Sequence, residues 1–105
     1  MSDLPLVGFL ALSAALLSIG LFGILTRRNF ILLLIAIEIA MNATILNFVY
    51  FAAYTGGTAG LTGQSIAVVL VGFAATEVAV GLAIVLALNR LKGTINVAQA
   101  TELKL

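Results

Sequence analysis

The segment FILLLIAIEIAMNATILNFVY, residues 30–50, is apolar almost throughout, yet Glu38 lies near its middle. About 20 predominantly apolar residues are enough for an α-helix to cross the hydrocarbon core of a membrane. A backbone surrounded by lipid must satisfy its hydrogen bonds within the segment, so a helix is the predicted structure. This segment therefore decides the fold class, and its carboxylate raises the question of function.

The rest of the chain extends this pattern. Of its 105 residues, 63% are hydrophobic and only 9% are charged, which is far from the composition of soluble domains. We predict an all-α integral membrane protein, with residues 1–105 forming a single unit of three transmembrane helices. The predicted helices cover about 6–25, 30–53 and 66–88. The glycine-rich residues 55–63 are predicted as a loop, and the polar tail, 93–105, is predicted to lie outside the membrane.

The basic residues predict the orientation. With three crossings, all five of them fall on one side of the membrane: Arg27, Arg28, Arg90, Lys92 and Lys104. By the positive-inside rule, this side is the inner one, so the N-terminus is expected outside and the C-terminus inside. The inner-loop residues Arg27 and Arg28 are interpreted first as determinants of topology.

The absence of certain residue types excludes several classes of chemistry. The sequence has no cysteine, histidine or tryptophan. Disulfides, zinc or iron–sulfur sites, haem ligation by histidine or thiolate, and Ser–His or Cys–His nucleophiles are therefore excluded. Neither a glycine-rich phosphate loop nor a cofactor or metal site is predicted in this chain. Any chemistry must rely on carboxylates and water.

Two carboxylates stand out, because Glu77 repeats the situation of Glu38 within GFAATEVAVGLA, residues 72–83. A charged side chain at the bilayer centre costs roughly 3 kcal/mol on insertion scales, and such residues usually mark function. The helical rise places both glutamates near mid-depth, about 5 Å apart in height and within roughly 10 Å of each other. Waters can bridge that gap, so both are candidates for proton transfer; the alternative is a hydrogen bond that only joins helices.

Other polar and small residues qualify this prediction. Asn42 lies one turn beyond Glu38 and is a candidate supporting group, whereas Asn47 is half a turn away and is expected to face elsewhere. A cationic partner for either glutamate must come from a neighbouring chain. Small residues suited to close helix packing form two seams, which we expect to contact other subunits: Gly8, Ala11, Ala15 and Ser18 on the first helix, and Ala75, Ala79, Ala83 and Ala87 on the third.

Four short motifs occur in a recognisable order: LTRRN at 25–29, IEIAMNA at 37–43, GQ at 63–64 and AATEVAVGLAIVLAL at 74–88. Over nearly its whole length the chain resembles the NuoK subunits of respiratory complex I, the bacterial counterparts of the mitochondrial 4L subunit. The resemblance implies a membrane-arm subunit of a proton-pumping NADH:quinone oxidoreductase. It also implies that Glu38 and Glu77 contribute to a hydrated proton path, with Arg27 and Arg28 as the loop arginines.

The resemblance further implies partners and a location. NuoJ-, NuoN-, NuoA- and NuoH-type subunits would surround the chain, and NADH, FMN, iron–sulfur clusters and quinone would bind other subunits. A bacterial inner membrane is expected in preference to the mitochondrial one. Thr76 departs from the alanine that is usual in the family. Its hydroxyl can add a hydrogen bond near Glu77 or bond back to its own helix.

Two alternatives remain open at this point. An MrpC-type subunit of a multisubunit cation/proton antiporter would share the helices without the redox partners. A purely structural membrane protein, such as a pore-forming holin, would not explain two isolated glutamates at mid-membrane depth.

Overall fold

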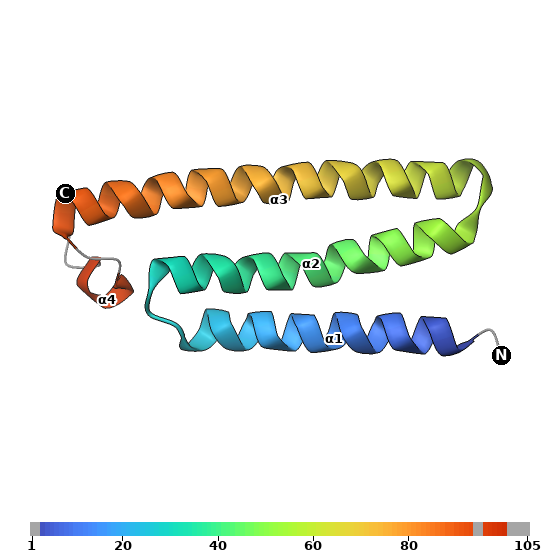
Figure 1. Ribbon diagram of the computed structural model, residues 1–105, viewed down its shortest axis with the longest axis horizontal. Helices are drawn as coiled ribbons and strands as arrows, with labels where there is room; N and C mark the ends of the chain where they lie inside the picture. Colours follow the sequence, from blue (N-terminus) through green and yellow to red (C-terminus); the bar gives the residue numbers. More distant parts are fainter. Residues whose placement is uncertain (1–2, 94–95, 101–105) are drawn as a thin grey trace.

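The computed structural model describes residues 3–93 and 96–100. Three long helices, α1 (Asp3–Thr26), α2 (Phe30–Thr55) and α3 (Gly57–Lys92), follow one another, with α2 antiparallel to both α1 and α3, and a short α4 (Val97–Ala100) follows (Figure 1). All three long helices are long and apolar enough to cross a membrane. The prediction of an all-helical chain with three candidate spans is confirmed.

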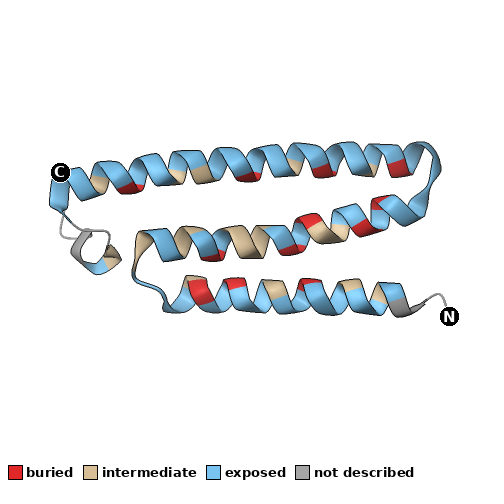
Figure 2. Cartoon of the chain, viewed as in Figure 1, coloured by how far each residue is buried: buried red, intermediate tan, exposed pale blue. Residues whose placement is uncertain are grey.

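The long helices form a single layer in which α2 lies between α1 and α3 (Figure 1). The molecule measures 56 × 25 × 15 Å, so it is little more than one helix thick in its shortest dimension. Buried residues lie along the faces where neighbouring helices meet, and most of the remaining surface is exposed (Figure 2). Such a layer leaves two broad faces free for lipid or for other subunits.

The predicted glycine-rich loop at residues 55–63 was wrong, because α3 already begins at Gly57. The turn between α2 and α3 is made by Gly56 and Gly57, with φ angles of +73° and +58°. This left-handed region favours glycine, which has no Cβ to clash with the backbone. Two residues therefore complete the turn. The predicted helix at 66–88 lacks the first nine and the last four residues of α3.

The glycines after the turn serve helix packing. A Cβ atom on Gly60 would lie 2.9 Å from the carbonyl oxygen of Ala52, and one on Gly63 would lie 2.8 Å from the Ala52 Cβ. Both distances are shorter than any normal contact, so only glycine allows α3 to approach α2 this closely. Small residues at a helix contact are the usual way for helices to associate in lipid.

The tail does not simply leave the helices. Gly93 ends α3 in a left-handed conformation, and its N–H donates to the Asn89 carbonyl at 2.7 Å. Asn96 then forms a β-bridge with Asn29, and the Val97 N–H donates to the Arg28 carbonyl at 2.6 Å. The β-bridge and this hydrogen bond join the tail to the α1–α2 connection. Residues 94–95 and 101–105, with Lys104, lie outside the described residues.

The predicted small-residue seams face away from the neighbouring helices of this chain. The seam alanines of α3 and the small residues of the α1 seam are exposed: Ala75, Ala79, Ala83, Ala87, Gly8, Ala11, Ala15 and Ser18. Contacts with α2 use other small residues, including Gly20 and Gly23 on α1 and Gly81 on α3. The role of the seams in contacts with other subunits stays a prediction.

Candidate functional site

The helix register places the two glutamates opposite each other. Gly81 on α3 meets Leu34 on α2, and Gly63 on α3 meets Ala52 on α2, which fixes the antiparallel alignment along their length. Glu38 lies four residues after Leu34, and Glu77 lies four residues before Gly81. One helical turn is about 3.6 residues, so both glutamates lie at the same level and close to the contacting faces.

Glu38 is the more enclosed of the two. Its side chain is half-buried, and its Oε1 atom is buried without a hydrogen-bond partner in the described part of the chain. The N-terminus of α2 is fixed upstream by Asn29, whose side-chain oxygen accepts hydrogen bonds from the N–H groups of Ile31 and Leu32. This cap sets where the helix begins and hence the depth of Glu38.

The Glu77 side chain is exposed at the surface of the helix layer. Its exposed side chain helps to line a cavity of about 400 Å³ between α2 and α3. The remaining lining residues are Leu34, Ile37, Thr76, Val80, Gly81 and Ile84. A buried acceptor on one helix and an accessible carboxylate on the other can exchange a proton through water that reaches this level.

The two predicted supporting groups differ in their surroundings. The Thr76 hydroxyl donates to the Gly72 carbonyl at 2.9 Å, so it bonds back to its own helix. Asn42 is exposed on α2, one turn beyond Glu38, and its side-chain amide is free to meet water or another subunit. The inner-loop Arg27 and Arg28 are also exposed. Within the described residues, no three potential metal ligands among His, Cys, Asp and Glu cluster together.

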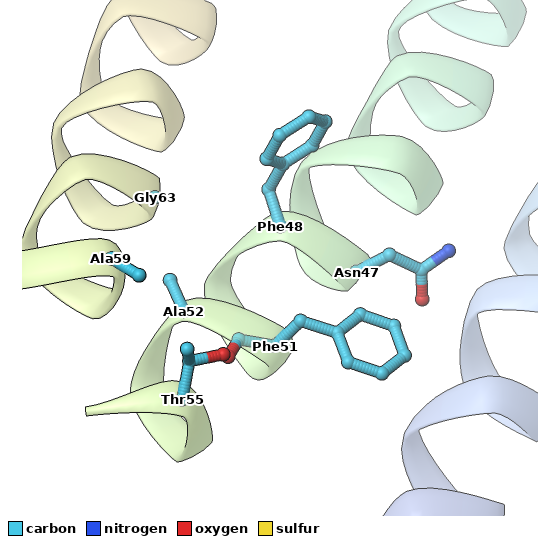
Figure 3. A pocket seen from close by; sticks show the side chains of 7 residues that line it. All are labelled: Asn47, Phe48, Phe51, Ala52, Thr55, Ala59 and Gly63. Carbon is cyan, nitrogen blue, oxygen red and sulfur yellow. The ribbon is translucent and has the colours of Figure 1, made fainter.

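A second polar position lies on the opposite face of α2. The Asn47 Oδ1 atom is buried without a hydrogen-bond partner among the described residues, and Figure 3 shows this side chain pointing towards α1, away from α3. Gly20 meets Ala40 across the α1–α2 contact. Ser13 lies seven residues, or two turns, before Gly20, and Asn47 lies seven residues after Ala40. Because α1 and α2 are antiparallel, the buried Ser13 is therefore level with Asn47.

The facing direction of Asn47 was predicted correctly, but Ser13 was missed. Ser13 lies between Ala11 and Ala15 of the predicted α1 seam, and nothing in the sequence distinguishes it from Ser18. In the structure, the Ser18 hydroxyl is exposed and donates to the Ala14 carbonyl, whereas Ser13 is only 7% exposed. The pairing of the two helices distinguishes them, and a single sequence does not reveal that pairing.

Comparison with known proteins supplies the family. The family described as NADH-ubiquinone/plastoquinone oxidoreductase chain 4L matches residues 8–105. The chain is 43% identical over 104 residues to NADH-quinone oxidoreductase subunit K of Geobacillus sp. (strain WCH70), and 44% identical over 104 residues to that of Bacillus anthracis, with 99% of each chain covered. A relative of the same name from Anaeromyxobacter sp. (strain K) is 42% identical over 100 residues, covering 95% of this chain and 98% of its own.

Proposed function

The chain belongs to the family of NADH-quinone oxidoreductase subunit K, which makes it a membrane-arm subunit of a proton-translocating enzyme complex, and we propose that Glu38 and Glu77 carry protons through it. The observation that carries this proposal is the shared level of the two glutamates on α2 and α3. One of them has an enclosed, unpartnered carboxylate oxygen, and the other lines an accessible cavity.

The chemistry follows from this arrangement. A carboxyl group can accept a proton from water on one side and release it to water on the other, and ordered waters bridge gaps that direct hydrogen bonds cannot span. Facing helices lie about 8–10 Å apart, so one or a few waters would connect the glutamates. The thin layer leaves Glu77 exposed and Glu38 only half-buried, and neighbouring subunits would complete the water path.

The partners and the location belong to the same proposal. NuoJ-, NuoA- and NuoH-type subunits would supply the path on the quinone side, and a NuoN-type subunit would continue it. The curated relatives quoted above are bacterial, which supports a bacterial inner membrane, with the N-terminus outside and the arginine-bearing loop inside. These relatives carry the name of a quinone oxidoreductase subunit, which favours this function over the antiporter subunit.

The test is Glu38→Gln in the complete complex, reconstituted in vesicles. Glutamine keeps the size of the side chain and much of its hydrogen bonding but cannot titrate. We expect the complex to assemble normally on a native gel while proton uptake per quinone reduced falls sharply. A fully assembled Glu38→Gln complex that pumps like the wild type would leave Glu38 as a structural hydrogen-bonding group.

A further inference from the structure

A hollow on the exposed surface of α3 lies apart from the two glutamates. It has a volume of about 470 Å³ and is lined by Ala83, Leu86, Ala87, Arg90 and Leu91. Four of its five lining residues are apolar, and the exposed Arg90 guanidinium is its only charged group. Ala83 and Ala87 lie one turn apart on α3, and Arg90 lies one turn beyond Ala87. The hollow therefore combines an apolar surface with one cation at its end.

The hollow spans the border of the membrane. The contact between Leu34 and Gly81 places Phe30, the first residue of α2, level with Val85 on α3. Arg90 lies five residues further along α3, about 7.5 Å beyond that level. Ala83 precedes Val85 by two residues and therefore lies on the other side of this level from Arg90, towards the membrane centre. Ala83 thus lies at the depth of acyl chains, Ala87 lies about 3 Å beyond the border, and Arg90 lies at the depth of headgroups.

Further cations share this end of the molecule. Arg27 and Arg28 precede α2, Lys92 ends α3, and the hydrogen bond from Val97 to Arg28 keeps the two segments together. No salt bridge is formed among the described residues. The acidic side chains that the structure describes, Glu38 and Glu77, lie further along α2 and α3, away from this end. Positive charge at this border is therefore not neutralised by the part of the chain that the structure describes.

We propose that this hollow binds an anionic phospholipid, with the phosphate on Arg90 and one acyl chain over Ala83 and Ala87, which takes the place of a subunit contact at this end of the predicted α3 seam. A guanidinium pairs with phosphate through two parallel hydrogen bonds, and basic pockets beside transmembrane helices bind anionic headgroups. A transmembrane helix of another subunit would cover Arg90 and would have to bring its own carboxylate to that depth. A phospholipid already carries its anion there.

The experiment places a photoreactive benzoylphenylalanine at Leu86 in the assembled complex. The complex is reconstituted in vesicles of phosphatidylcholine with a minor share of phosphatidylglycerol, then irradiated, and the adducts on this subunit are identified by mass. Phosphatidylglycerol adducts should exceed their share of the bilayer roughly fivefold, the preference expected from one paired arginine. A probe at Val68, exposed on α3 but outside the hollow, should show no such enrichment.

Substitutions then test the role of the charge. Arg90→Gln should abolish the enrichment, and Arg90→Lys should retain most of it, because the positive charge stays at the same depth. Arg27→Gln removes a cation from the same end but outside the hollow and should change little. Crosslinking of the Leu86 probe to another subunit, lipid adducts that mirror the bulk composition, or undiminished enrichment in Arg90→Gln would each overturn the proposal.

Discussion

At the scale of single residues, the two glutamates differ in what surrounds them. Glu38 has an enclosed oxygen without a partner, whereas the exposed Glu77 lines an open cavity that water or another subunit can reach. If a buried carboxylate can no longer exchange a proton, the proton path has few alternatives at that point. Water can carry the path past an accessible carboxylate. We therefore expect Glu77→Gln to reduce proton pumping by the assembled complex less than Glu38→Gln does. Equal or greater loss in Glu77→Gln would contradict this order.

Moving the carboxylate provides a second test at this scale. Asn42 lies one turn beyond Glu38 and is exposed, so a glutamate there would be about 6 Å away and open to water. The double variant Glu38→Gln/Asn42→Glu should recover part of the pumping lost in Glu38→Gln, because a chain of waters tolerates such a shift. Proton uptake per quinone reduced is again the measurement. No recovery would indicate that Glu38 acts through direct contact.

Thr76 should be dispensable although it is adjacent to Glu77. Its hydroxyl already donates to the Gly72 carbonyl, so removing it breaks a bond within one helix turn and nothing in the cavity. Thr76→Ala should leave both pumping and assembly at wild-type levels. A marked loss of pumping would show that the hydroxyl leaves Gly72 and joins the water path.

The approximate relative height of these residues was predictable, but their enclosure was not. The rise of 1.5 Å per residue is fixed, so counting from the arginines placed Glu38 and Glu77 near the same height. The helix register places them level, where counting predicted a difference of about 5 Å. Which of them is enclosed depends on how the faces of α2 and α3 meet, and that contact is set by Gly81, Gly63 and Ala52 together. No single segment of sequence carries this information.

At the scale of the helices, glycine decides how closely they pack. A Cβ atom on Gly20 would lie 2.7 Å from the Ala40 backbone nitrogen and 2.9 Å from the Ala36 carbonyl oxygen, and backbone atoms cannot move aside cheaply. Gly20→Ala should therefore weaken the α1–α2 contact by about 1–3 kcal/mol, as overpacking commonly does. The yield of assembled complex after mild detergent extraction and its thermal stability are the measurements.

Gly8→Ala is the matched control for Gly20→Ala. Both glycines belong to α1, but a Cβ on Gly8 meets nothing within 4 Å. Alanine is also the better helix former, so Gly8→Ala should leave the yield and thermal stability unchanged or slightly raised. If both variants lose stability equally, a contact with another subunit is responsible, and the tight α1–α2 approach is not.

The same property explains the main error in predicting the helices. Glycines between residues 55 and 63 were interpreted as a loop, because glycine is common in turns and rare in soluble helices. In helices of membrane proteins, glycine is also the residue that permits close approach, and Gly60 and Gly63 are used in that way against Ala52. Composition alone does not separate these two uses. The neighbouring helix separates them, and its position is known only from the fold.

At the scale of the whole molecule, α3 is longer than a membrane requires. Its 36 residues rise about 54 Å, against a hydrocarbon core of about 30 Å. The predicted segment, 66–88, rises about 35 Å, which is enough to cross that core. The remaining turns extend beyond the core at both ends: small and polar residues after Gly57 at one end, and Arg90 and Lys92 at the other. Hydropathy finds the part of a helix that contacts lipid, whereas hydrogen bonding and packing determine where the helix ends.

This length makes the orientation of the chain testable at two well-separated points. The native chain has no cysteine, so single cysteines can be introduced at the exposed Thr58, near the start of α3, and at the exposed Ala98 in α4. Both positions avoid the left-handed glycines 56, 57 and 93, where a side chain would strain the backbone. Because the described basic residues all lie at the Ala98 end of the molecule, the positive-inside rule predicts Thr58 outside and Ala98 inside. A membrane-impermeant maleimide added to intact cells should therefore label Thr58→Cys but not Ala98→Cys, and inverted vesicles should give the opposite result. Labelling of both from one face would contradict three crossings, whereas a complete reversal would keep the crossings and overturn only the proposed orientation.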